Sequence, residues 1–384
     1  MTRVTLGLLL ARTGSQMAAL AMVLFVLERY RSPTLAGFTV FAALAPGVLV
    51  SPIAGALLDR HGRKWLIVLD QVVAAVALFL IGALALGKLL PPPLLLAIVL
   101  AQSVTFPLST AGARSLYPML VPRSLWDRVN AVDSGLYVVA TLVGPPIAGG
   151  LVAAAGGPAA IIMLGLVFAA SAVVMSGLRD PETDVTTSGS LAGDALAGLR
   201  YVVSNPSLRA LALCIGTFNV AGGIFSVAIP VIVFQRLHGG PALVGALWAV
   251  LGAAGIISGF VFGRVGSEGR ERGLLAGGLA LGAVATILLA LAPGLALFAV
   301  GMALLGVANG PTDIALFSLR QRRTDPSWFG RAFAVSMALN VTGIPIGAAL
   351  AGPLIGISLL AAMGVAVAFT ALSAVMPVTI PKDG

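Results

Sequence analysis

Seven polar side chains stand inside long apolar stretches of this 384-residue chain, where ionisable and amide groups are costly to bury. Side chains kept at that cost are candidates for binding a substrate or carrying a coupling ion. A carboxyl group among them could take up a proton, and a nearby arginine would tune it. A structural role for the acids, as caps or as partners of basic residues, is an open alternative. The seven candidates are Arg12, Gln16, Asp70, Asp133, Asn219, Asn309 and Asp313.

Helical spacing groups four of these side chains into two pairs. Arg12 and Gln16 stand four residues apart and share one helix face, as do Asn309 and Asp313. We interpret Arg12 and Gln16 as lining a central cavity, because the sequence shows no obvious local partner for the arginine. The alternative basic partners for the three acids are Arg114, Arg128 and Arg320.

The elements that must hold these side chains are membrane-spanning helices. Hydrophobic residues make up 59% of the chain and charged residues 10%, with a mean hydropathy of +1.05. Soluble domains carry about a quarter charged residues. Apolar runs of about 20 residues, long enough to cross a bilayer, recur along the chain. We therefore expect an all-α integral membrane protein with twelve transmembrane helices, near residues 5–27, 35–58, 65–87, 94–116, 128–153, 158–178, 207–233, 241–263, 273–291, 295–318, 330–352 and 355–378.

The distribution of basic residues predicts the orientation of these helices. Of the 23 Lys and Arg residues, 18 fall on the side of the two termini, four on the other side, and Arg12 inside the first helix. Basic loops stay in the cytoplasm, so both termini are expected there. The net charge of +9 then reflects topology and anionic lipid headgroups and does not indicate nucleic-acid binding. We expect a multi-pass protein of a bacterial cytoplasmic (inner) membrane.

The chain contains two similar halves. Five positions recur after 204 residues, which predicts two pseudo-symmetric six-helix bundles related by an axis along the membrane normal. We expect an N-terminal bundle over residues 1–178, a cytoplasmic linker over 179–206 with a short surface helix at 191–203, and a C-terminal bundle over 207–384. The repeated positions are Gly55 and Gly259, Arg60 and Arg264, Gly62 and Gly266, Pro107 and Pro311, and Pro122 and Pro326.

A short charged connection, GALLDRHGRK at residues 55–64, joins the second and third expected helices. Its positive charges suit the cytoplasmic side, and its glycines allow a turn. The segment resembles the signature loop of the major facilitator superfamily, G-x-x-x-D-R-x-G-R-[KR], at every signature position. This resemblance implies a cytoplasmic gate in which Asp59 contacts the N-terminal end of the eleventh helix. The gate residues are Gly55, Asp59, Arg60, Gly62, Arg63, Lys64 and Arg331.

A run rich in glycine and proline occupies the fifth expected helix. Glycines let a neighbouring helix approach, and proline removes a backbone donor and bends the helix. The run is similar to the pattern G-x8-G-x3-G-P-x2-G-G of exporters in the superfamily, although Ala140 and Ala148 replace two of its glycines. The similarity implies outward transport, and a generic small-residue packing face is the alternative. The motif residues are Gly135, Gly144, Pro145, Gly149 and Gly150.

No motif indicates an enzyme. The phosphate-binding sequence G-x-x-x-x-G-K-[ST] is absent, so ATP is not expected to drive this protein. His61 and His238 lie in loops on opposite faces and cannot form a metal or acid–base pair. We expect no cofactor and no metal, with a proton gradient or another ion gradient as the driving force. The R-x-x-Q-G pattern of many proton-coupled members is missing, so proton antiport is an expectation from resemblance alone.

Further residues resemble the branch of the superfamily that contains enterobactin and macrolide exporters, namely Asn130, Ala131 and residues 198–201. The resemblance implies a secondary active transporter that exports a small amphipathic or hydrophobic compound, such as a drug, siderophore or metabolite. Alternating access would take place around a site formed by helices one, four, seven and ten. An uptake symporter, a lysophospholipid flippase and a non-transporting membrane sensor remain alternatives. We expect a monomer that contacts membrane lipids and binds neither ATP nor nucleic acid.

Overall fold

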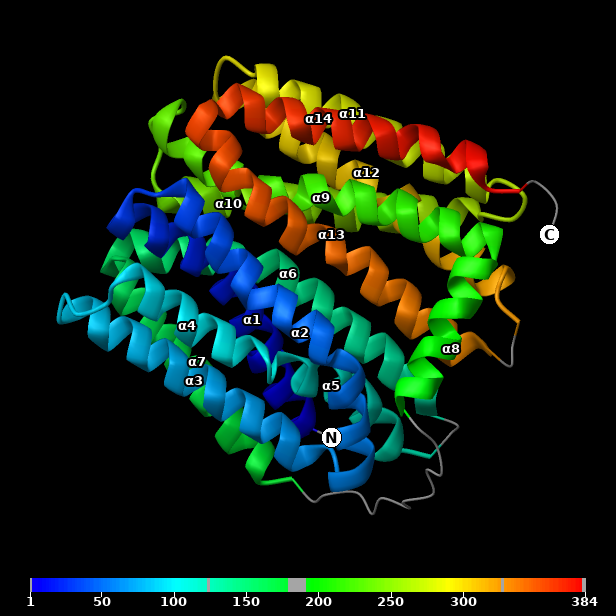
Figure 1. The fold of residues 1–384 in the computed structure, drawn as a ribbon, viewed down its shortest axis with the longest axis horizontal. Coiled ribbons are helices and arrows are strands. Elements are labelled where there is room, and N and C mark those ends of the chain that lie inside the picture. Colours follow the sequence, from blue (N-terminus) through cyan, green and yellow to red (C-terminus); the bar gives the residue numbers. More distant parts are fainter. Residues whose placement is uncertain (1, 123–124, 179–190, 326–327, 382–384) are drawn as a thin grey trace. The chain divides into compact units, whose positions relative to one another are not determined.

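Long helices account for nearly all of the structure. The computed structural model describes residues 2–122, 125–178, 191–325 and 328–381. Over these residues it contains fourteen α-helices and no strand (Figure 1). Twelve described segments are long and apolar enough to cross a membrane, with α4 and α5 together forming one of them. The predicted all-α fold with twelve spans is confirmed.

The chain divides into two compact units, of which the first comprises Met1–Arg31 and Phe38–Leu191. In this unit α1 packs against α6 and α7, and α3 packs against α7. The helices are α1 (Thr2–Tyr30), α2 (Pro33–His61), α3 (Lys64–Leu86), α4 (Pro92–Ser103), α5 (Phe106–Met119), α6 (Trp126–Ala155) and α7 (Gly157–Ser176).

The second unit comprises Ser32–Gly37 and Ala192–Gly384. Here α9 packs against α13 and α14, while α12 packs against α10 and α11 (Figure 1). Residues 179–190 of the predicted linker lie outside the described residues, and a helix follows them. The helices are α8 (Leu191–Ser204), α9 (Pro206–Gln235), α10 (Pro241–Val265), α11 (Glu271–Leu291), α12 (Leu295–Arg322), α13 (Phe329–Ile357), α14 (Leu359–Val375) and the 3₁₀ helix η3 (Met376–Thr379).

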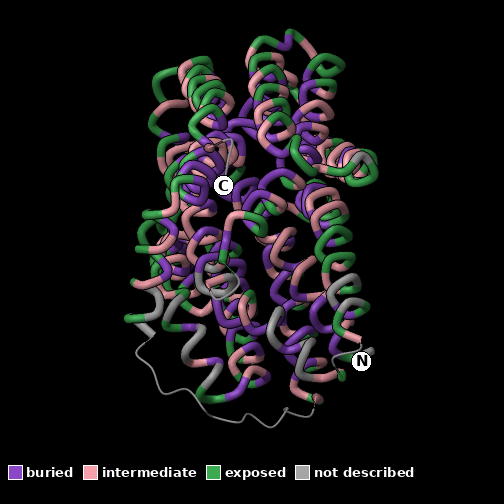
Figure 2. The backbone as a smooth tube through the Cα atoms, turned by 90° about the vertical axis from the view of Figure 1, so that its right-hand side faces the viewer, coloured by how far each residue is buried: buried purple, intermediate pink, exposed green. Residues whose placement is uncertain are grey.

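Buried and exposed residues alternate along the spans, as the purple and green of the backbone in Figure 2 show. Leu49, Val173 and Ile357 are 79%, 72% and 78% exposed, and many Val, Leu, Ile and Phe side chains on other spans are exposed as well. A soluble monomer rarely leaves so much apolar surface uncovered. Lipid is the solvent that such a surface requires.

Two repeated glycines end equivalent helices in the two units. Gly62 follows α2 with φ of 81°, and Gly266 follows α10 with φ of 70°. Both angles lie in the left-handed region, which costs glycine little and other residues more. The pair supports the predicted 204-residue repeat at the level of backbone conformation.

Backbones approach closely where α9 meets α13. A Cβ atom added to Gly223 of α9 would overlap the carbonyl oxygen of Ile344, and one added to Gly347 of α13 would overlap that of Val220. Gly343 meets the carbonyl of Gly216 in the same way. Small residues bring membrane helices into this kind of contact.

The fourth span is broken, contrary to the single helix expected over residues 94–116. Helix α4 ends at Ser103 and α5 begins at Phe106, so Val104 and Thr105 form a turn. Pro107 has no N–H group and cannot donate to the carbonyl four residues earlier, that of Ser103. The amides of Thr105 and Leu108 instead donate three residues back, to Gln102 and Thr105.

The equivalent proline of the second unit, Pro311, lies inside the continuous helix α12. The carbonyl left without a helical donor there belongs to Val307, and the Ser258 hydroxyl of α10 donates to it at 2.6 Å. Gly310 makes room, because a Cβ atom there would overlap that hydroxyl. The first unit has Ala54 at the position of Ser258 and lacks this donor.

We expect Ser258→Ala to lower the free energy of unfolding by about 1–2 kcal/mol, because it leaves the Val307 carbonyl buried without a donor. The melting temperature of purified protein in detergent measures the effect. Ser226→Ala is the matched control, since the Ser226 hydroxyl bonds only to Gly223 of its own helix. Equal melting temperatures for the two variants would contradict this account of Pro311.

Candidate functional site

Arg12 and Asp133 form an ion pair between α1 and α6. Arg12 Nη2 lies 2.7 Å from Asp133 Oδ1, and Arg12 Nη1 donates to the backbone carbonyl of the same aspartate. The two side chains are 16% and 20% exposed. Arg12, for which the sequence shows no obvious local partner, thus has a distant one. Its partner lies 121 positions away in the sequence, on a helix that packs alongside α1.

One helical turn further on, Gln16 extends the same contact. Gln16 Nε2 donates to Thr141 Oγ1 at 2.8 Å. Beyond it, a Cβ atom at Gly144 would lie 2.7 Å from Gln16 Cβ, so only glycine fits. We call the five residues that join α1 to α6 the α1–α6 seam: Arg12, Gln16, Asp133, Thr141 and Gly144.

The contacts of α6 show at which glycines of the fifth-helix motif a neighbouring helix approaches closely. Close helix approach holds at Gly144. It does not hold at Gly135 and Gly150, where an added Cβ atom would meet nothing within 4 Å. Gly149 is buried, and α6 continues through Pro145 without interruption. Among Gly135, Gly144 and Gly150, close helix approach is thus confined to Gly144.

A second polar group, the α3–α5 cluster, comprises Asp70, Gln71, Thr105 and Ser109. Thr105 Oγ1 donates to Asp70 Oδ1 at 2.7 Å, and Gln71 Nε2 donates to Ser109 Oγ at 2.7 Å. Gln71 Nε2 also lies 3.4 Å from Asp70 Oδ2. Asp70 and Gln71 are 2% and 1% exposed. No described basic side chain forms an ion pair with this aspartate.

The candidates of the second unit are dispersed. Asn219 Nδ2 of α9 donates to the Asn340 carbonyl of α13 at 2.8 Å, which places it in a helix contact. Asn309 and Asp313 share a face of α12, but within the described residues they form no hydrogen bond with each other or with another side chain. The Asp313 side chain is exposed. The structure does not bring these three residues together.

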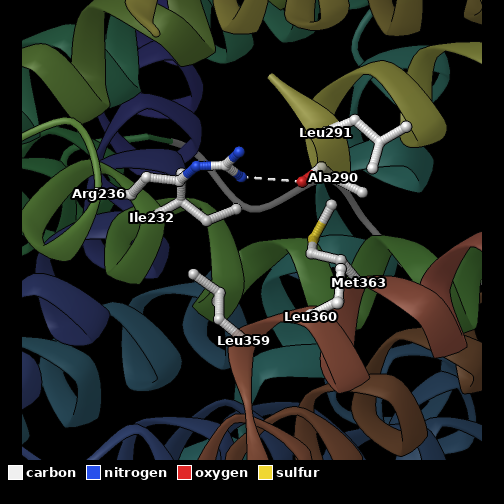
Figure 3. A pocket seen from close by; sticks show the side chains of 7 residues that line it. All are labelled: Ile232, Arg236, Ala290, Leu291, Leu359, Leu360 and Met363. Carbon is white, nitrogen blue, oxygen red and sulfur yellow. Dashed lines mark hydrogen bonds between the residues drawn. The ribbon is translucent and has the colours of Figure 1, made fainter. Parts of the chain in front are cut away.

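A pocket of about 340 Å³ in the second unit contains none of the predicted residues. Arg236 Nη1 donates to the carbonyl of Ala290 at 2.8 Å beside the pocket (Figure 3). The rest of its lining is apolar, and the residues are Ile232, Arg236, Ala290, Leu291, Leu359, Leu360 and Met363.

Sequence reasoning missed the environment of Arg320, which it assigned to a cytoplasmic loop. Helix α12 continues to Arg322, four residues past the expected end, and this extension buries Arg320 completely. Its guanidinium lies 5.6 Å and 5.0 Å from the ring centroids of Phe317 and Phe333. Nη1 contacts Met337 Sδ at 3.1 Å. Phe317 and Phe333, which precede and follow Arg320 in the sequence, could have indicated cation–π packing.

Asn340 completes the surroundings of Arg320. With its amide oxygen turned toward the guanidinium it accepts from Nη2 at 2.8 Å, and its nitrogen donates to the Ser336 carbonyl at 3.1 Å. A neutral cage of aromatic, thioether and amide groups thus holds this cation between α12 and α13. The partnership of Arg320 with Asp313, left open by the sequence, is not present.

The gate motif lies where α2 ends and α3 begins. Arg60 is exposed, and Arg63 precedes α3. Lys64 is only 7% exposed, with its ammonium group 4.4 Å from the Trp65 ring, so it is less available for gate pairs than expected. The burial of Gly55 and the side chains of Asp59 and Arg331 are not described. The contact of Asp59 with the eleventh span stays a prediction.

The chain matches known proteins over nearly all of its length. The family model described as Major Facilitator Superfamily matches residues 4–348. The chain is 36% identical over 379 residues to the uncharacterized MFS-type transporter y4rN of Sinorhizobium fredii, covering 97% of this chain and 93% of the relative.

Two further relatives carry names that state outward transport. The multidrug efflux pump Tap of Mycolicibacterium fortuitum is 26% identical over 361 residues, covering 90% of this chain and 87% of the relative. The enterobactin exporter EntS of Escherichia coli is 29% identical over 335 residues, covering 84% and 76%. A crystal structure of a mutant nucleoside transporter NupG matches with a TM-score of 0.75 over 99% of both chains at 12% identity, a likeness of fold alone.

Proposed function

The chain belongs to the major facilitator superfamily, and from that membership we propose that it is a secondary active transporter that exports a small amphipathic or hydrophobic compound. The proposed outward direction of transport rests on the similarity to an efflux pump and an exporter over 84–90% of this chain. Glycine at position 144, which the α1–α6 seam requires, supports the same direction through the exporter-type run in α6. Drugs, siderophores and related metabolites are the substrate classes to test.

The proposed mechanism is alternating access, with a substrate site formed by α1, the α4–α5 span, α9 and α12. Within the first unit, the α1–α6 seam ties a helix that would line this site to the helix with the exporter motif. The pair of Arg12 and Asp133 gives the seam two opposite charges that are only partly shielded from solvent. A charged or polar substrate group can compete for either member, so the pair is suited to respond to substrate.

The proposed setting is a bacterial cytoplasmic membrane with both termini in the cytoplasm, as the excess of basic residues on that side predicts. The protein would act as a monomer surrounded by lipid. A proton or another ion would supply the driving force, without ATP or a bound cofactor.

Transport into inside-out membrane vesicles tests the proposed function, because export then appears as uptake. Amphipathic dyes, macrolides and siderophores are the probes. We expect uptake of at least one class above the level of vesicles that lack the protein. Accumulation only in right-side-out vesicles would reverse the proposed direction, and no flux of any probe in either orientation would contradict transport of these compounds.

We expect Asp59→Asn to reduce transport by roughly twofold to tenfold, since a charge at a helix N-terminus contributes about 0.5–1.4 kcal/mol. The contact would latch the outward-open state, so its loss should also increase labelling of a cysteine introduced on the cytoplasmic side. The single native cysteine, Cys214, is buried and gives little background.

His61→Asn is the matched control for this experiment, because His61 is exposed two positions away and stands at a variable position of the motif. Wild-type transport together with wild-type labelling in Asp59→Asn would exclude the latch.

A further inference from the structure

Asp70 is a carboxyl group buried within a membrane span. It lies six positions into α3, its side chain is 2% exposed, and α7 and the two halves of the broken fourth span pack against its helix. An ionised carboxylate in such a place needs a compensating charge or becomes neutral.

Among the described side chains of α3, α4, α5 and α7, Lys64 is the only basic one. Neither α4 nor α7 contains an ionisable residue. Helix α5 contains Arg114 and Tyr117, whose side chains are not described, nine and twelve positions after Thr105. On α3 itself, Lys64 lies about 120° around the helix from Asp70 and packs on Trp65. The ionisable residues of α2, whose Gly47 abuts the break, stand together at its end: Asp59, Arg60 and His61.

The α3–α5 cluster contains more oxygen acceptors than hydrogen-bond donors. Thr105 supplies one hydroxyl to Asp70 Oδ1, and Ser109 forms a second side-chain hydrogen bond with the same carboxyl group. Gln71 Oε1 is buried and has no donor, and the carbonyl of Ser103 lost its helical donor to Pro107. An unpaired acceptor beside a carboxylate that forms no ion pair with a described side chain is the arrangement that a bound positive charge would complete.

The second unit provides an internal comparison, because it lacks the cluster. At the repeat distance of 204 residues, Leu274 and Leu275 stand in place of Asp70 and Gln71. Asn309 and Asp313 replace Thr105 and Ser109, and Ser258 caps the carbonyl that the first unit leaves open. The break in the helix and a buried acid at this position thus occur together in the first unit, and the second unit has neither at the repeat positions.

We propose that Asp70 is the site at which this transporter binds its coupling proton, with the side-chain amide of Gln71 turning over as the proton arrives. The assignment rests on the proposed transport function. A proton adds to Oδ2 of the carboxylate, no other bond forms or breaks, and the buried charge is neutralised. The 2.7 Å contacts in the cluster leave no room between their atoms for a metal cation, whereas a proton needs only a lone pair.

The amide of Gln71 is suited to follow the protonation state. With Asp70 ionised, the amide nitrogen faces Oδ2 at 3.4 Å, as in the structure. With Asp70 protonated, Oδ2 becomes a donor, and the exchanged amide presents its oxygen to the acid. In that orientation the Ser109 hydroxyl donates to the same amide oxygen at the position now held by Nε2. Because Thr105 and Ser109 belong to the broken fourth span, protonation of Asp70 would change the hydrogen bonds of that span.

Difference infrared spectroscopy on the purified full-length protein tests the site without requiring a substrate. Between acidic and alkaline buffer, the wild type should show the carbonyl stretch of a buried carboxylic acid, and Asp70→Asn should lose that band. Glu268→Gln, which changes an exposed acid of the second unit outside the membrane spans, should keep it. A band unchanged in Asp70→Asn would overturn the proposal, as would a band displaced when Na⁺ replaces choline at constant pH.

Gln71→Leu introduces the residue found at the repeat position and tests the amide. The acid band should persist but shift in frequency, because the carboxyl group loses its amide partner. An unshifted band would remove Gln71 from the mechanism. This variant also keeps the site testable if Asp70→Asn fails to fold.

Transport then separates the site from the overall function. In proteoliposomes Asp70→Asn should retain exchange of substrate between the two sides but lose accumulation driven by a pH gradient, which falls to the equilibrium level. Gradient-driven accumulation equal to wild type would contradict the proposal. If the wild type carries no compound, the proposed function fails, while the infrared result still decides whether Asp70 titrates.

Discussion

Gly223→Ala is expected to destabilise the second unit severely. The added Cβ atom would overlap the carbonyl oxygen of Ile344 and come within 2.7 Å of the Ala348 amide nitrogen and 2.9 Å of the Gly347 Cα atom. All three are backbone atoms of α13, so no side chain can rotate away and the two helices must separate. Overpacking costs about 1–3 kcal/mol where side chains can adjust, and a backbone clash belongs at or above the upper end of that range.

The neighbouring residue provides the control for this prediction. A Cβ atom at Gly222 would meet nothing within 4 Å, so Gly222→Ala should be neutral or should stabilise α9 through the higher helix propensity of alanine. Melting temperature and the folded fraction after size-exclusion chromatography measure both variants. Similar stability for the two would show that α9 and α13 do not pack as closely as described.

Arg12→Ala is expected to abolish most transport, because it leaves Asp133 partly buried without its cation. Removing one partner of a fully buried pair costs about 3–5 kcal/mol, and partial exposure of this pair reduces the cost to roughly 1–3 kcal/mol. Asp133→Ala should have a similar effect from the other side. Substrate flux and melting temperature need to be measured together, since the pair joins two helices. Arg3→Ala is the control, because Arg3 is exposed on the same helix and bonds only to the Gly177 carbonyl.

The double variant Arg12→Met with Asp133→Leu separates the two roles of the pair. A purely structural pair can be replaced by apolar side chains with stability regained. We expect the double variant to recover the melting temperature but not the flux. Recovery of both would reduce the pair to a packing element and remove it from the substrate site.

The architecture was predictable because it depends on local sequence. Apolar runs of membrane-crossing length identified the spans, and a left-handed glycine ended both α2 and the equivalent α10, as the repeat of Gly62 at Gly266 implies. Hydropathy responds only to composition within a window, so it passed over the break at Val104 and Thr105. Pro107 carried the signal for that break, but its repeat Pro311 lies in a continuous helix, and the difference is a hydroxyl on another helix.

The polar contacts were less predictable because they join residues far apart in the sequence. The sequence around Arg12 does not indicate its ion pair with Asp133. The sequence around Asp70 does not indicate its hydrogen bond with Thr105. Arg320 was misjudged because a helix end displaced by four residues turns a loop cation into a buried one. The glycines of the fifth span were predicted to pack closely because they belong to a motif. Close glycine contacts also join α9 and α13, where the sequence shows no motif.

Flux of substrate in proteoliposomes with an imposed pH gradient tests the central claim, coupled export, most directly. Purified protein would be reconstituted and supplied with the compound that gives the strongest uptake in inside-out vesicles. We predict accumulation against the concentration gradient that collapses when the pH gradient is dissipated, with wild type and Glu268→Gln alike and Asp70→Asn reduced to equilibration. Accumulation that persists without the pH gradient, or flux that only equilibrates the compound in the wild type, would contradict the account.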